Sequence, residues 1–137
     1  MPRLIPLFMT GMMLVSAGMA QAATDRSPEA QLARATAGRV AGQPVDCINQ
    51  HEIRSTRIID KTAIVYEMNG GTVYVNRPTS GASSLRSDLV LVTDTHSTQL
   101  CSVDIVRLYD SGSRMQNGTV GLGQFVPYPR PPRGSGD

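Results

Sequence analysis

The residues best suited to chemistry are the two cysteines and two histidines of the chain. They form the patterns Cys47-x3-His51 and His96-x4-Cys101. Two thiolates and two imidazoles together are a ligand set that zinc takes in proteins. In an oxidising compartment, two cysteines form a disulfide instead. The four residues therefore indicate either a metal site or a disulfide, and the compartment decides between them.

The N-terminal residues indicate the compartment. Arg3 is followed by an apolar run over residues 4–17 without any charge, and small residues stand at Ala20 and Ala22. This order is typical of a secretory signal peptide, whereas a membrane-spanning helix needs about 20 predominantly apolar residues. We therefore predict a signal peptide over residues 1–22, with its cleavage site fixed to within about two residues. The mature protein is then periplasmic or secreted, without stable membrane insertion.

Export favours the disulfide over the metal site. A bond between Cys47 and Cys101 closes a long loop, for which the chain-entropy model gives about 4 kcal/mol of stabilisation. We predict this bond, no bound metal or cofactor, and surface positions beside it for His51 and His96. A Cys/His metal site is the alternative.

Other catalytic patterns are missing from the sequence. There is no G-x-S-x-G nucleophile elbow, and the glycines of 118–123 lack the lysine of a phosphate-binding loop. The formal net charge is only +2, without the clustered basic excess that nucleic-acid binding requires. Arg57, Asp104 and Arg107 fall in or beside the most apolar stretches, where a charge needs a partner. Structural salt bridges explain these three residues, with a ligand site as the alternative.

The elements that position these residues are mainly β-strands. Short β-branched and aromatic runs alternate with turn residues, and Asn69-Gly70-Gly71 predicts a tight hairpin because asparagine and glycine tolerate positive φ. Apolar residues on both faces of 101–109 predict a strand that is covered on both sides. The predicted strands are 57–59, 63–68, 72–76, 89–93 and 99–109.

The spacing of the strands predicts a mainly β fold, a small antiparallel sheet or barrel of about five strands. Residues 111–118 indicate a polar loop, and 118–123 a tight turn before a final strand. The predicted organisation is a flexible or short helical linker (23–42), one monomeric β-rich domain (43–128) and a disordered Pro/Gly-rich tail (129–137).

A short N-terminal helix is also expected. Ser27 stands before Pro28 as an N-cap would, and Gly38 is available as a stop, which predicts a helix over 28–37. Leu32 is its only sizeable apolar residue, so the helix has little with which to dock.

Four strings of the sequence together resemble a known family. They are Cys47–Asp60, Tyr74–Asn76, Cys101–Asp104 and Gly121–Pro127. This pattern is similar to the small exported Gram-negative proteins that are grouped as a domain of unknown function, and the likeness covers residues 45–128. The resemblance implies an exported, compact domain. No activity, cofactor or partner is established for that family, so no catalytic residue follows from it.

The chain departs from the family pattern in its cysteines. Members often carry two further cysteines, where this chain has residues near Ala82 and Val120. If these two cysteines form a second disulfide in the family, a chain should lose both together, since a single unpaired thiol is a liability after export. The resemblance therefore also leaves Cys47 paired with Cys101.

We expect a binding or structural module of the cell envelope that performs no chemistry. One alternative is a small metal-dependent or hydrolytic enzyme built around Cys47, His51, His96 and Cys101. Another is an inhibitor of an envelope enzyme. The sequence does not name a partner.

Overall fold

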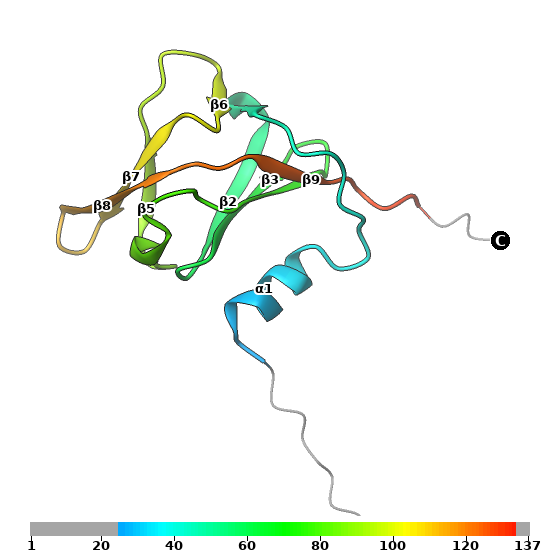
Figure 1. Cartoon of the computed structure of the whole chain (residues 1–137), viewed down its shortest axis with the longest axis horizontal. Helices are drawn as coiled ribbons and strands as arrows, with labels where there is room; N and C mark the ends of the chain where they lie inside the picture. The colour runs from blue at the N-terminus through cyan, green and yellow to red at the C-terminus, as the bar shows by residue number, and fades with distance from the viewer. Residues whose placement is uncertain (1–24, 134–137) are drawn as a thin grey trace, which may run out of the picture.

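The computed structural model describes residues 25–133, so the predicted signal peptide and residues 134–137 of the predicted tail lie outside it. Within this range the chain forms one α-helix, two 3-10 helices and nine strands (Figure 1). No helix among these residues is both long and apolar enough to cross a bilayer. The elements are α1 (Pro28–Ala35), β1 (Cys47–Asn49), η1 (Gln50–Glu52), β2 (Ile53–Ile59), β3 (Ala63–Met68), β4 (Val73–Asn76), η2 (Ala82–Ser84), β5 (Val90–Thr93), β6 (Gln99–Cys101), β7 (Ile105–Asp110), β8 (Met115–Gly121) and β9 (Phe125–Tyr128).

The mainly β class is confirmed, as three small antiparallel sheets rather than a closed barrel. Their strand orders are β2-β3-β4-β9, β5-β7-β8 and β1-β6. All neighbouring strands of these sheets pair antiparallel. Consecutive strands joined by short connections form three of the pairs, β2-β3, β3-β4 and β7-β8. The predicted hairpin is present between β3 and β4, where Gly71 adopts a φ of +92° that suits glycine.

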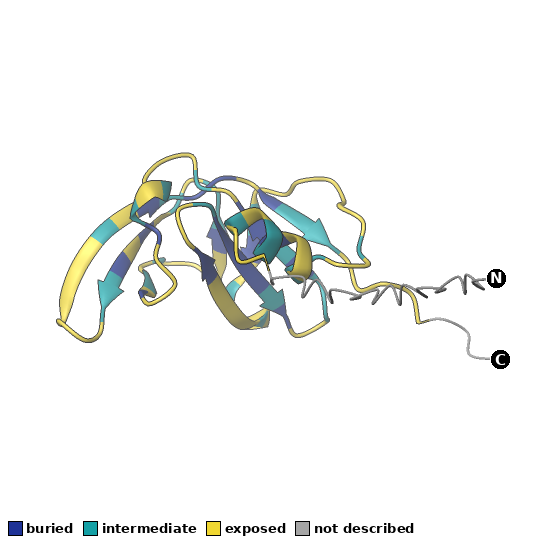
Figure 2. Ribbon diagram, turned by 90° about the horizontal axis from the view of Figure 1, so that it is seen from below, coloured by how far each residue is buried: buried dark blue, intermediate teal, exposed yellow. Residues whose placement is uncertain are grey.

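Strand β3 is buried on both faces and holds the layers together. Figure 2 shows buried segments gathered in the central strands of the fold. Side chains alternate along a strand, so Ala63 and Val65 point to one side while Ile64 and Tyr66 point to the other. The first pair belongs to the apolar cluster under α1, and the second pair belongs to the larger cluster shared with the other two sheets. The four-stranded sheet is therefore the middle layer of the fold.

Helix α1 packs through Leu32, which contradicts the expectation that the helix has little with which to dock. Leu32 is only 5% exposed and lies against apolar side chains of β2, β3 and β4. Ser27 caps the helix as predicted, because its hydroxyl accepts the Ala30 N–H at 3.3 Å. A single large side chain is sufficient here because the sheet face beneath it is itself apolar. The helix ends at Ala35, two residues before the predicted end.

The larger apolar cluster lies between the four-stranded sheet and the two smaller sheets. Its centre holds Phe125, whose ring meets Tyr66 edge-on at 5.6 Å between centroids and Tyr74 at 6.4 Å. Such edge-to-face pairs stabilise a core beyond the burial of their area. The remaining buried members are Ile48, Ile58, Ile64, Met68, Leu85, Leu89, Leu100, Val106, Leu108, Val120 and Leu122.

Two predictions are wrong, one of a strand and one of a loop. The predicted strand 99–109 is broken into β6 and β7 by a turn in which Asp104 N–H donates to Cys101 C=O at 3.0 Å. Its second half is covered on one side only, since Val106 and Leu108 are buried while Ile105 is 64% exposed. The predicted loop 111–118 instead contains most of β8, because pairing with β7 overrides its weak local propensity.

A buried asparagine joins β4 to the chain before β9. Asn76 is fully buried; its amide donates to Gly123 C=O at 2.7 Å and accepts Gly123 N–H at 2.9 Å. A side chain on Gly123 would collide with Arg77 C=O, since a Cβ there would lie 2.3 Å from that oxygen. The pair therefore satisfies both main-chain groups of a residue that must be glycine.

Replacing Asn76 with alanine should lower the free energy of unfolding by about 2–4 kcal/mol, because it leaves the Gly123 N–H and C=O buried without partners. Urea unfolding followed by circular dichroism measures the change. Asn117→Ala, at an exposed asparagine of β8, is the matched control and should change stability by less than about 0.5 kcal/mol. Equal effects of the two variants would contradict the role given to Asn76.

Burial raises the pKa of the Tyr66 hydroxyl above its ordinary value. The unfolded chain loses this proton near pH 10, while the folded chain keeps it to higher pH. Stability should therefore fall above about pH 10, by up to about 1.4 kcal/mol per pH unit. Tyr66→Phe should remove this part of the decline in unfolding curves recorded from pH 8 to 11, and Tyr109→Phe should not. An unchanged alkaline slope in Tyr66→Phe would refute the assignment.

Candidate functional site

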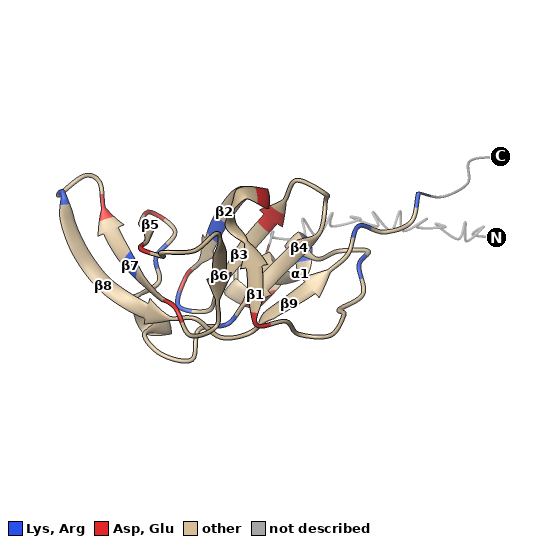
Figure 3. Cartoon of the chain, turned by 90° about the horizontal axis from the view of Figure 1, so that it is seen from above, with Lys and Arg blue, Asp and Glu red and all other residues tan. Residues whose placement is uncertain are grey.

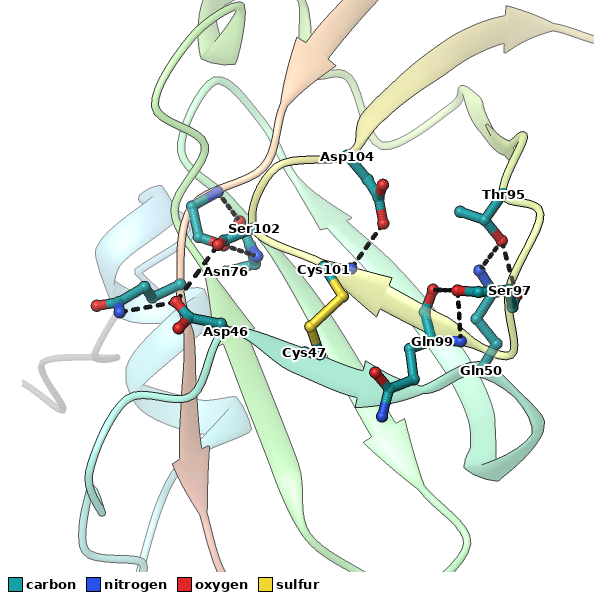
Figure 4. Close-up of a disulfide and its surroundings, with 12 residues drawn as sticks. Asp46, Cys47, Gln50, Asn76, Thr95, Ser97, Gln99, Cys101, Ser102 and Asp104 are labelled. Carbon is teal, nitrogen blue, oxygen red and sulfur yellow. Dashed lines mark hydrogen bonds between the residues drawn. A yellow bond between two sulfur atoms is a disulfide. The ribbon is translucent and has the colours of Figure 1, made fainter.

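The predicted disulfide is present and closes the two-stranded sheet (Figure 4). Cys47 and Cys101 stand directly opposite each other in β1 and β6, with their Cα atoms 4.0 Å apart. On one side of this pair, Ser102 N–H donates to Asp46 C=O at 2.7 Å. The alternation of antiparallel ladders then makes the cysteines a non-hydrogen-bonded pair, the position at which opposing Cα atoms lie closest. The ladder thus brings the two thiols together.

The groups around the disulfide hold the main chain. Asp104, one of the three charged residues singled out in the sequence, accepts Cys101 N–H at 2.7 Å through its carboxylate. Asp46 accepts from the Gln124 side chain at 3.0 Å and from the Ser102 hydroxyl at 3.4 Å. Figure 4 shows these contacts on both sides of the sulfur bridge. Each carboxylate has a structural task at this corner.

The two histidines do not build a metal centre with the cysteines. His51 and His96 are both exposed, as predicted, and both thiols are consumed by the disulfide. Among residues 25–133, no three histidine, cysteine, aspartate or glutamate side chains gather as metal ligands would.

The two arginines singled out in the sequence have separate partners. Arg57 lies 3.5 Å from Glu67, which also binds Arg54 at 3.1 Å. The hydrogen bond from Arg54 is the main reason that the pKa of Glu67 lies below its usual value. Arg107 lies 3.4 Å from Asp94. Arg57, Arg107 and Asp104 therefore have separate partners, and the structure does not bring them together into one site. Figure 3 shows basic and acidic residues scattered along the chain, with both signs interspersed over the strands and loops.

A cleft of about 290 Å³ lies between α1 and strands β4 and β9. Arg77 closes one side of it by donating two hydrogen bonds to Glu29, each 3.0 Å long. This hydrogen-bonded pair is the main reason that the pKa of Glu29 lies below its usual value. The contact ties the helix to the sheet, so the cleft is a consequence of helix docking.

A second groove, of about 390 Å³, lies between β2 and β5, each of which forms one edge of its sheet. One end is closed because Lys61 N–H donates to Leu85 C=O at 2.9 Å and Ser87 N–H donates to the Asp60 carboxylate at 2.6 Å. The two strands therefore run antiparallel from this closed end without sharing a hydrogen-bonded ladder. The lining consists of Thr56, Arg57, Ile58, Ser87, Leu89, Val90, Leu91 and Thr93.

Main-chain groups of β2 point into this groove. Met68 N–H donates to Thr72 C=O, so Met68 and every second residue before it in β3 direct their main-chain groups to β4. The residues between them direct their main-chain groups to β2. By the register of β2 with β3, Thr56 and Ile58 then belong to non-hydrogen-bonded pairs. Their N–H and C=O groups point away from β3, and within residues 25–133 they have no main-chain partner on that side.

The same holds for β5 on the opposite wall. Leu122 N–H donates to Asp104 C=O, so every second residue of β7 counted from Asp104 directs its main-chain groups to β8. The residues between them direct their main-chain groups to β5. Leu91 and Thr93 of β5 then direct their main-chain groups away from β7, again without a main-chain partner in the described part of the chain. The described residues that line the groove include no histidine, cysteine or carboxylate, so their side chains offer no nucleophile with a base. This groove suits binding.

Sequence reasoning missed this groove because it placed a strand only over 57–59. The polar run from Arg54 to Arg57 is a feature of edge strands, which often carry charge to discourage unwanted pairing. That run, just before Ile58, was the available signal for β2. The packing of the two sheets decides which other strand edge lies opposite β2. No local sequence pattern indicates that packing.

Neither protein-family models, nor curated proteins, nor solved structures give a match to this chain. The resemblance to exported Gram-negative proteins stays a prediction.

Reducing the disulfide should lower the free energy of unfolding by about 4 kcal/mol. Adding one equivalent of zinc to the reduced protein should not restore that loss, because the histidines do not converge on the thiols. Urea unfolding with and without reductant and zinc measures both effects. A variant with Cys47→Ser and Cys101→Ser should be insensitive to reductant. Recovery of stability with zinc would favour the metal site instead.

Proposed function

We propose that this protein is a non-catalytic binding module of the cell envelope, which holds its partner in the groove between β2 and β5. The observation that carries the proposal is that two free strand edges face each other across this groove. Four residues, Thr56, Ile58, Leu91 and Thr93, direct main-chain donors and acceptors into it. Main-chain donors and acceptors that have no partner and lie beside an apolar floor can bind a partner molecule.

The location in the envelope rests on two features. The sequence begins with the pattern of a secretory signal, and the Cys47–Cys101 bond is of the kind that persists in oxidising compartments. Periplasmic and secreted locations both agree with these features. We propose that the protein works as a monomer there.

The enzymatic alternative loses its support from the cysteines. A metal-dependent or hydrolytic centre at Cys47, His51, His96 and Cys101 needs thiolates, and both sulfur atoms are bonded to each other. An inhibitor of an envelope enzyme is the special case in which the bound partner is an enzyme. The identity of the partner separates an inhibitor from other binding modules.

Site-specific photo-cross-linking in cells that produce the protein tests the binding groove. A benzophenone amino acid in place of Val90, which is 48% exposed on the groove wall, should give a discrete adduct. The same probe in place of Val103, which is 84% exposed in the turn between β6 and β7, should give none. Mass spectrometry identifies the partner, and the purified partner should bind the purified protein. Absence of any adduct from Val90 would refute the proposal.

A further inference from the structure

We infer that the occupant of the β2–β5 groove is an extended segment of a partner protein, which adds to the free edge of β2 and places an acidic side chain beside Arg57. This inference rests on the proposed function and names the chemistry of the partner. It combines the main-chain groups, the floor and the charge of the groove.

The main-chain groups call for an extended chain. Thr56 and Ile58 are two positions apart in β2, which is the spacing at which an added strand makes its hydrogen bonds. Leu91 and Thr93 repeat this spacing on the facing edge. A peptide in β conformation presents donors and acceptors at the same interval, whereas a helix has its own paired internally.

The floor of the groove selects the side chains on one face of such a segment. Ile58 and Leu89 are each 6% exposed, and Leu91 packs against the same core. Alternate side chains of an added strand would lie over this apolar floor, while the others would face outward. The segment should therefore alternate apolar and polar residues.

The charge of the groove selects an acidic partner. Among residues 25–133, Arg57 is the only charged residue of the lining, and its side chain is 56% exposed. Its present partner, Glu67, lies closer to Arg54, at 3.1 Å against 3.5 Å. The Arg57 side chain can thus form a salt bridge with a carboxylate of the added segment, while Glu67 stays paired with Arg54. A neighbouring carboxylate across paired strands is a favourable cross-strand contact.

The same charge argues against a second copy of this chain pairing through β2. Two antiparallel β2 strands that use the edge groups of Thr56 and Ile58 bring the Arg57 residues of the two copies opposite or diagonal to each other. Like charges at these positions destabilise the pair. A different, acidic chain does not meet this repulsion.

Amide hydrogen exchange of the isotopically labelled full-length mature protein tests the inference. The probe is a capped heptapeptide of alternating valine and threonine with glutamate at its central outward position. At millimolar peptide we expect the amides of Thr56 and Ile58 to exchange at least about tenfold more slowly, because each becomes hydrogen-bonded. The same peptide with lysine in place of glutamate should bind about threefold more weakly.

Two variants and one control variant distinguish strand addition from nonspecific binding of the peptide. Arg57→Gln should remove the preference for glutamate over lysine, while Arg107→Gln, whose arginine lies outside this groove, should keep it. Thr56→Pro removes an N–H that points away from β3 and so breaks no hydrogen bond of the β2–β3 ladder; the fold should therefore persist while peptide protection is lost. If Thr56→Pro fails to fold, the Arg57 comparison still decides.

Unchanged exchange of Thr56 and Ile58 with every peptide would overturn the inference, as would protection that survives in Thr56→Pro. A cross-linked adduct from Val90 with no peptide protection would leave the binding module standing and refute the strand. An adduct in which the partner is this same chain would replace the acidic partner with a second copy.

Discussion

A strand that is apolar on both faces needs a layer on each side, and β3 imposes this requirement on the rest of the chain. Ala63 and Val65 need cover on one side, and Ile64 and Tyr66 need it on the other. Helix α1 supplies the first cover with little more than Leu32. The smaller sheets supply the second through their side chains and do not continue the ladder of β2. The edges of β2 and β5 stay free because the smaller sheets cover one face of the four-stranded sheet and do not pair with its edge strand β2.

Two contacts join segments that are far apart in the sequence, one within the two-stranded sheet and one beside the pair β4 and β9. The disulfide joins Cys47 to Cys101, and the amide pair joins Asn76 to Gly123. Figure 4 shows Asn76 and the disulfide in the same region of the fold. Both contacts have a structural role, and neither assigns chemistry to the residues that form it.

The parts of the fold that were predictable from the sequence are those with a local signal. The β3–β4 hairpin follows from Asn69-Gly70-Gly71, the helix cap from Ser27, and the disulfide from the presence of two cysteines together with the predicted signal peptide. Strand β8 was missed because Gln116-Asn117-Gly118 has weak strand propensity and is ordered by β7. The groove was missed because it arises where two sheets fail to join, and no local sequence pattern records that.

The disulfide also changes how the folded chain carries a pulling force. A chain drawn from both ends transmits tension through the sulfur bridge, which joins residues 54 positions apart. Strands β7, β8 and β9 lie outside the bridged loop and are exposed to that tension, while β2, β3, β4 and β5 lie inside it. Both walls of the groove therefore belong to a covalent ring that tension applied at the ends cannot stretch out.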